Sequence, residues 1–142
     1  MTQREFDLED RLLEYSASII RLVEKMQNTR AANHVGGQLL RSGTSPLFNH
    51  GEAQAAESQN DFIHKMKVCL KELRESKRAF RLIKRVPLIE NPAEIDPLMK
   101  ETEELIRIFV TSIRTAEQNR IREEPSDAYG PDPSSSKFDA GC

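Results

Sequence analysis

Several features that mark other classes of protein are missing from this sequence. It contains two cysteines, Cys69 and Cys142, and no tryptophan. Two distant cysteines make neither a disulfide framework nor a metal-ligand spacing, which favours a reducing compartment. No apolar run approaches the ~20 residues that a membrane-spanning helix needs, and the first ten residues lack the apolar core of a signal peptide. We therefore expect a cytoplasmic protein that does not enter a membrane.

Motifs of the common enzyme classes are missing too. The sequence has no phosphate-binding glycine-rich loop and no nucleophile-elbow motif. His34, His50 and His64 form neither a Glu-x-x-His repeat nor a His-x-x-x-His pair, so we expect no di-iron site. Cys69 falls on an apolar helical seam, which favours a small core residue over a reactive thiol. The sequence thus predicts a protein that is not an enzyme, with no catalytic residue, no metal and no cofactor.

What the chain does contain is charge and helical periodicity. Charged residues make up 31% of the 142 residues, and the formal net charge is −2. Such a composition is typical of amphipathic helices with solvated outer faces around one core. Because the net charge is close to zero, binding to nucleic acid would require a local basic patch.

Four long segments carry the helical period. The first spans about residues 7–27, the second 31–56, the third runs from a cap at Ser58 to Pro87, and the fourth continues from Asn91 or Pro92 to Glu123. Short connections predict antiparallel neighbours, hence an all-α, up-down four-helix bundle over residues 1–123. Residues 124–142 hold three prolines and a serine run with little to bury, which predicts a disordered C-terminal tail.

Two segments show a regular apolar seam, with steps of four and three residues. The seam of the third segment consists of Phe62, Met66, Cys69, Leu73, Ser76, Phe80 and Ile83. The seam of the first consists of Leu8, Leu12, Tyr15, Ile19, Leu22 and Met26. Further apolar residues beside these seams, such as Leu13 and Ile20, widen the apolar face beyond what one bundle buries. The extra width predicts a second covered surface and therefore a homo-oligomer.

The second segment contains two residues that disfavour a helix interior. Gly43 costs about 1 kcal/mol relative to alanine. Pro46 lacks the N–H that would bond the residue four positions back, at a cost of about 3 kcal/mol or more. Two outcomes are open: one helix with a kink at Pro46, or a break with Ser45 as the cap of a new helix.

The same segment contains a residue pattern that resembles that of a known protein family. It reads Gln38-Leu39-Leu40-Arg41-Ser42-Gly43-Thr44-Ser45, followed by Asn49, Glu52, Ser58 and Asp61-Phe62. Over about residues 6–120 the chain resembles the bacterial four helix bundle protein family, also called 23S rRNA-intervening sequence proteins. That family resembles the accessory protein of diversity-generating retroelements, which implies a ring-shaped homopentamer. Its members are encoded inside rRNA intervening sequences, which implies RNA or a nucleic-acid enzyme as the partner.

The chain departs from the family pattern at a few positions. Pro46 stands where an aliphatic residue is usual, Gly51 and Ala53 flank Glu52 where alanine and glycine are usual, and Asp61 replaces glutamate. Pro46 puts the straightness of the second helix in doubt. In the family this segment is one helix, so we predict a single kinked helix here.

A run of basic residues in the third segment is the sharpest candidate for a binding site. Between His64 and Arg85 there are nine basic residues against two acidic ones. Six of the nine step by four and three residues along one face, and we call these the basic stripe: Lys67, Lys71, Arg74, Arg78, Arg81 and Arg85. With the flanking Lys77 and Lys84, they are the predicted nucleic-acid-binding residues.

A structural alternative competes with this interpretation. The stripe could pair with Glu94, Glu101 and Glu104 of the fourth segment, or with a neighbouring subunit. Charge runs on helices are commonly solvated or paired faces, which favours this alternative. Aromatic residues are not interleaved with the stripe, which argues against a stacking platform for single strands.

A second polar group lies around Pro46. Arg41, Ser45, Asn49 and Glu52 are three or four residues apart and share a face if the helix is continuous. We expect a buried Arg–Glu hydrogen-bonded network that fixes helix register or a subunit contact, in preference to a ligand site.

These patterns lead to one functional hypothesis and two alternatives. We expect a non-catalytic oligomeric scaffold or adaptor that binds RNA or a nucleic-acid enzyme through the basic stripe. The first alternative is a helical module that binds only proteins, with the stripe engaged in salt bridges. The second is a bundle that binds a small molecule or a metal.

Overall fold

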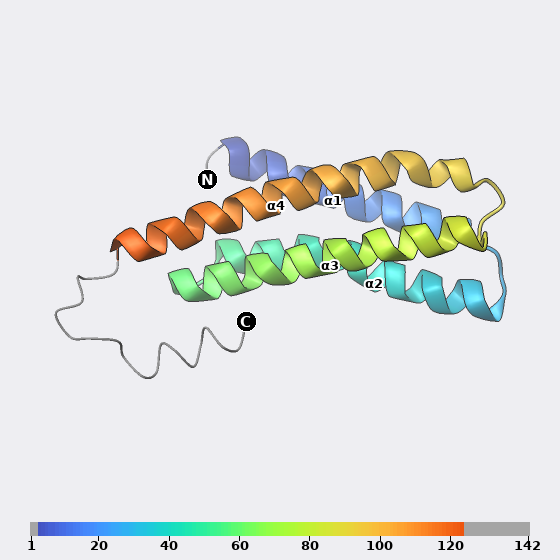
Figure 1. Ribbon diagram of the computed structural model, residues 1–142, viewed down its shortest axis with the longest axis horizontal. Coiled ribbons are helices and arrows are strands. Elements are labelled where there is room, and N and C mark those ends of the chain that lie inside the picture. The colour runs from blue at the N-terminus through green and yellow to red at the C-terminus, as the bar shows by residue number, and fades with distance from the viewer. Residues whose placement is uncertain (1–2, 124–142) are drawn as a thin grey trace.

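The computed structural model describes residues 3–123, with side chains from Asp7 onward. Its four α-helices are α1 (Gln3–Glu24), α2 (Arg30–Gln54), α3 (Gln59–Arg85) and α4 (Asp96–Glu123), and the short 3-10 helix η1 (Pro92–Ile95) precedes α4. Figure 1 shows the helices side by side, with successive helices running in opposite directions. The predicted all-α up-down bundle is confirmed. The tail predicted at 124–142 lies outside the described residues.

Polar side chains cap the starts of α2 and α3. The Thr29 hydroxyl accepts the backbone N–H of Ala32 at 3.1 Å and caps α2. Ser58 accepts the N–H of Asp61 at 3.0 Å and caps α3. Each cap satisfies a backbone donor that has no partner inside the helix. At its other end α3 stops at Arg85, before the cis peptide bond between Val86 and Pro87.

The core lies along the apolar seams. From Met66 to Ile83 every predicted seam residue of α3 is buried, and Phe62 is half-buried at the start of the helix. In α1 the buried seam residues are Leu12, Tyr15, Ile19 and Leu22. Phe80 and Phe109 are fully buried and are among the largest residues inside the bundle.

Helix α2 runs through Pro46 without a break, so the single helix is the correct alternative. Gly43 lets α2 approach α1 closely, because a Cβ at this position would lie 2.7 Å from side-chain carbons of Ile19. Pro46 is buried against α3, where its carbonyl accepts a hydrogen bond from the thiol of Cys69 at 3.6 Å. The two residues that disfavour a helix are thus both placed at close contacts with neighbouring helices.

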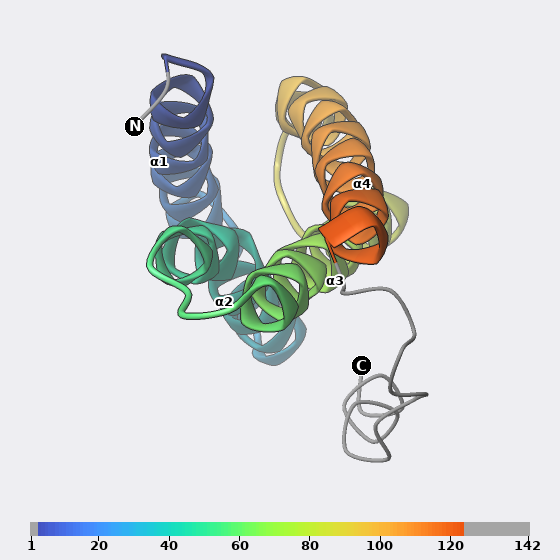
Figure 2. The same ribbon diagram turned by 90° about the vertical axis from the view of Figure 1, so that its left-hand side faces the viewer.

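The helices form an open arrangement in which α2 and α3 are central. α1 packs mainly on α2 and α4 mainly on α3, while α1 and α4 meet over a shorter stretch. Seen end-on in Figure 2, α1 and α4 diverge toward the end that holds the N-terminus of α1. At the opposite end the two connections pack together, with Gln27 N–H donating to Leu88 O at 3.2 Å. Within the described residues, no helix combines the length and apolarity needed to span a membrane.

Candidate nucleic-acid interface

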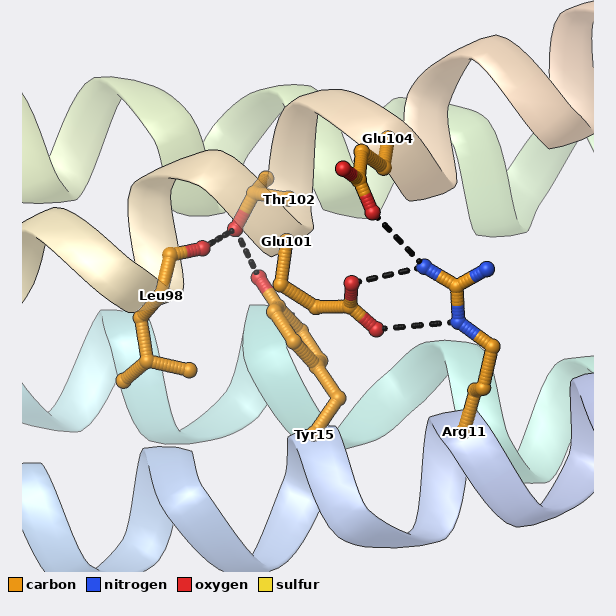
Figure 3. Close-up of polar contacts among 6 residues, drawn as sticks. All are labelled: Arg11, Tyr15, Leu98, Glu101, Thr102 and Glu104. Carbon is orange, nitrogen blue, oxygen red and sulfur yellow. Dashed lines mark hydrogen bonds and ion pairs between the residues drawn. The ribbon is translucent and has the colours of Figure 1, made fainter.

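An ion-pair cluster joins α1 to α4 where they meet, as Figure 3 shows. The Arg11 guanidinium donates two hydrogen bonds to the carboxylate of Glu101, at 2.6 and 3.1 Å, and one to Glu104 at 3.1 Å. The hydrogen bond to Glu101 raises the pKa of Arg11. Glu94 pairs with Lys25, near the end of α1, at 3.6 Å. The three acids that could have neutralised the basic stripe are therefore paired with cations at other positions.

Inside the bundle, hydroxyl groups from all four helices are buried: Tyr15, Ser42, Ser76 and Thr102. We call them the buried hydroxyl layer. Thr102 donates to Leu98 O at 2.6 Å, so the Tyr15 hydroxyl donates to Thr102 Oγ1 at 2.7 Å. Ser42 and Ser76 are hydrogen-bonded at 2.8 Å across α2 and α3. Burial raises the pKa of Tyr15 to about 12, although hydrogen bonds to Thr102 and Ser76 oppose the increase.

The polar network predicted around Pro46 is only partly formed. Asn49 donates to the hydroxyl of Ser45 at 2.8 Å and to its carbonyl at 3.1 Å. Arg41 is exposed, and Glu52 instead pairs with Lys65 of α3 at 2.9 Å. The prediction that Arg41 and Glu52 form a buried pair is therefore wrong for the single chain. Eleven residues at about 1.5 Å each place the two residues about 16 Å apart, beyond direct contact.

The basic stripe lies on the outer face of α3, and acids neutralise half of the eight predicted binding residues. Lys67 pairs with Glu117 at 3.7 Å, Lys77 with Glu103 at 3.9 Å and Lys84 with Asp96 at 2.6 Å, all across to α4. Arg78 pairs with Glu75 of its own helix at 3.2 Å. We call these four the paired set: Lys67, Lys77, Arg78 and Lys84.

The other half of the predicted residues remain available. Among the residues that the structure describes, no carboxylate lies within 4.0 Å of them, and all four are exposed. We call them the unpaired set: Lys71, Arg74, Arg81 and Arg85. From Lys71 to Arg85 they span about 21 Å at 1.5 Å per residue. Like charges held this close repel one another, and an anionic partner would relieve that repulsion.

Two neighbouring helices add cations that the sequence analysis did not assign to this surface. Arg41 of α2 lines a hollow of about 300 Å³ together with Lys71 and Arg78. Arg114 of α4 lines another, of about 490 Å³, together with Lys67, Lys71 and Arg74. Figure 2 shows α2 and α4 on opposite sides of α3, and Lys71 is shared by both hollows. Helical periodicity gives the face of a single helix, so it could not place Arg114 next to the stripe.

The divergent end of the bundle holds a separate groove of about 570 Å³. Arg11, Phe62 and Ile108 are among its lining residues, and His50 lies against it, with its ring edge-on to Phe109 at 6.2 Å. The groove mixes polar and aliphatic groups from all four helices. Within the described residues, no group of three or more histidine, cysteine or acidic side chains could hold a metal ion.

Comparison with known proteins gives a family and a fold. The family model described as 23S rRNA-intervening sequence protein matches residues 4–111. A crystal structure from Bacteroides thetaiotaomicron, of a protein with unknown function from the S23 ribosomal protein family, aligns with a TM-score of 0.69. The two are 30% identical, and the alignment covers 74% of this chain and 96% of that chain. No curated protein matches the chain.

Proposed function

Because this chain belongs to the 23S rRNA-intervening sequence protein family, we propose that it is a non-catalytic, oligomeric scaffold that binds RNA in the cytoplasm. The unpaired set on α3 is the observation that carries the proposal. Four exposed cations without described acidic partners, on one helix face, are suited to phosphate contacts. The Arg11 cluster supports the same conclusion, since it keeps Glu101 and Glu104 on the α1 side of α4.

Exposed apolar side chains support the oligomeric part of the proposal. On α1, Leu13 and Ile20 are 55% and 46% exposed, and on α2 Phe48 is 68% exposed. Leu13 and Ile20 are seven residues apart, so they share one face of α1. Contact with other copies of the chain would remove these side chains from water. Five copies is the number that the resemblance to the retroelement accessory protein implies.

Light scattering on the full chain at micromolar concentration tests the assembly. We expect a mass that is a multiple of the 16.2 kDa chain, and five-fold for the homopentamer. A mass of 16.2 kDa would show that the chain is a monomer and would contradict the proposed oligomer.

Fluorescence anisotropy of a labelled RNA tests the binding. If the four cations of the unpaired set each neutralise one phosphate, the logarithm of the association constant falls with the logarithm of salt. The expected slope is about −3 to −4. If the RNA stays unbound at 50 mM salt, the protein does not bind RNA through this surface.

A combined change of the unpaired set (Lys71, Arg74, Arg81 and Arg85) to glutamine separates RNA binding from a structural role. We expect lost RNA binding with an unchanged oligomer mass. If the oligomer itself dissociates, the stripe forms salt bridges between subunits, and the chain is better described as a protein-binding module.

A further inference from the structure

The cationic surface is wider than one helix face. Arg41 borders the stripe from α2, Arg114 borders it from α4, and both share their hollows with Lys71. Neighbouring helix axes lie about 8–10 Å apart, so the surface is about 16–20 Å wide across the three helices. Along α3 it extends about 27 Å from Lys67 to Arg85. Cations are therefore distributed both along α3 and across the three helices, whereas the phosphates of a single strand need only one row of cations.

The two sides of the surface differ in charge. The hollow on the α4 side is lined by Lys67, Lys71, Arg74 and Arg114 with the single acid Glu117. The hollow on the α2 side contains two acids, Glu72 and Glu75, against Arg41, Lys71 and Arg78. Anions should therefore be held more firmly at the α3–α4 side, with Arg41 as a weaker outer contact.

Aromatic side chains are lacking where a single strand would need them. Neither hollow has an aromatic residue in its lining. Phe48 is the only exposed phenylalanine, tyrosine or tryptophan among the described residues, and it lines neither hollow. Proteins that bind single strands without sequence preference combine a basic groove with aromatic rings on which unstacked bases lie. The floor on the α4 side is aliphatic instead, formed by Leu70, Val110 and Ile113.

From these observations we infer that the surface formed by α2, α3 and α4 binds the two-stranded phosphate backbone of a nucleic-acid duplex. This inference rests on the proposed function and narrows its ligand. In a duplex the bases stay stacked on one another, so the protein need not supply aromatic rings. Cations on α3 would contact one strand, and Arg114 would reach phosphates of the other. Contacts to phosphates carry no sequence information, so binding depends on duplex geometry rather than on base sequence.

The test compares three labelled probes with the full chain in one buffer: a 20-base-pair RNA duplex, a DNA duplex of the same sequence and a 20-nucleotide polyuridine. We expect both duplexes to bind at least ten-fold more tightly than polyuridine. Binding of the RNA duplex alone would still support the inference and would assign the ribose 2′-hydroxyl as a contact. Tighter binding of polyuridine would overturn the inference and leave RNA binding intact. If no probe binds, the proposed function itself is wrong.

A double variant tests the width of the surface. For the RNA duplex, Arg41→Gln with Arg114→Gln should make the slope of log association constant against log salt less negative by up to about 1.8. Each lost phosphate contact changes this slope by about 0.9. The control is Arg21→Gln with Arg30→Gln, which removes the same charge from exposed positions of α1 and α2. We expect the control to keep the original slope. Equal slopes for the double variant and the unmodified chain would confine binding to α3.

Discussion

The buried hydroxyl layer and the unpaired set are both polar, but their surroundings are opposite. Tyr15, Ser42, Ser76 and Thr102 are at most 4% exposed and are hydrogen-bonded across helices. The cations of the unpaired set are exposed and lack acidic partners among the described residues. Buried polar groups need partners inside the protein, whereas surface charges are solvated without them. The inner layer therefore helps to fix how the helices pack, while the outer set remains accessible from solvent.

Substitutions in the two regions should therefore affect different properties of the protein. Changes in the interior should lower the free energy of unfolding and leave the salt dependence of RNA binding unchanged. Changes in the unpaired set should do the reverse.

Phe80→Ala should have the largest effect. Phe80 is fully buried in the α3 seam, one turn beyond Ser76, so truncation leaves a cavity in the bundle. We expect the free energy of unfolding to fall by about 3–5 kcal/mol. Urea denaturation followed by circular dichroism measures the change. An unchanged denaturation midpoint would show that Phe80 is not in the core.

Gly43→Ala should have the next largest effect. The added Cβ would lie 2.7 Å from side-chain carbons of Ile19, so either this side chain or the packing of α1 on α2 must shift. Overpacking costs about 1–3 kcal/mol, and the gain in helix propensity recovers up to about 1 kcal/mol. Gly37→Ala is the matched control, because nothing lies within 4 Å of a Cβ at that position of the same helix. The control should stabilise the chain, and a stabilised Gly43→Ala would contradict the close approach of α1 and α2.

Tyr15→Phe should lower the free energy of unfolding by about 1 kcal/mol near neutral pH, since it removes the hydrogen bond to Thr102. The effect should depend on pH. Burial raises the pKa of Tyr15 from 10 to about 12, so folding favours the neutral phenol. This contribution is fully present below pH 10 and is lost as the pH rises toward 12.

Stability curves of both proteins from pH 8 to 11.5 check this prediction. The destabilisation by Tyr15→Phe should shrink above pH 10 and can change sign. Cys69 gives a similar loss in both proteins, because burial raises the pKa of its thiol to about 12, and this loss cancels in the comparison. A difference that stays constant with pH would mean that Tyr15 is not buried.

The sequence was sufficient to predict the features that depend on local spacing. The α3 seam, the cap at Ser58 and the end of α3 before Pro87 all follow from periodicity and short-range hydrogen bonding. The continuous α2 followed from the family resemblance, since local propensity at Gly43 and Pro46 left a break equally open. Close packing against Ile19 on α1 accounts for the glycine there.

Features that depend on the third dimension could not be predicted. Which acids of α4 face α3 depends on how α4 is rotated in the bundle. Glu101 and Glu104 turn to Arg11, while Glu103 and Glu117 turn to α3. The division of the basic residues into a paired and an unpaired set follows from that rotation. Ser42 is hydrogen-bonded to Ser76, which lies 34 residues away in the sequence, so local spacing could not identify this pair.

We expect position, and not total charge, to decide which cations of α3 bind RNA. Two quadruple glutamine variants test it, one in the unpaired set (Lys71, Arg74, Arg81 and Arg85) and one in the paired set (Lys67, Lys77, Arg78 and Lys84). Each removes four positive charges from the same helix. Salt bridges at such exposure contribute only about 0–1 kcal/mol each, so both variants should fold.

The decisive measurement is the salt dependence of RNA-duplex affinity for these two variants and the unmodified chain. The unpaired-set variant should lose most of its affinity for the RNA duplex. Its slope of log association constant against log salt should become less negative by about 3–4, while its melting temperature stays the same or rises. The paired-set variant should keep most of the slope and lose a little stability. Equal loss of affinity and slope in the two variants would contradict this expectation, because α3 would then act only through its total charge.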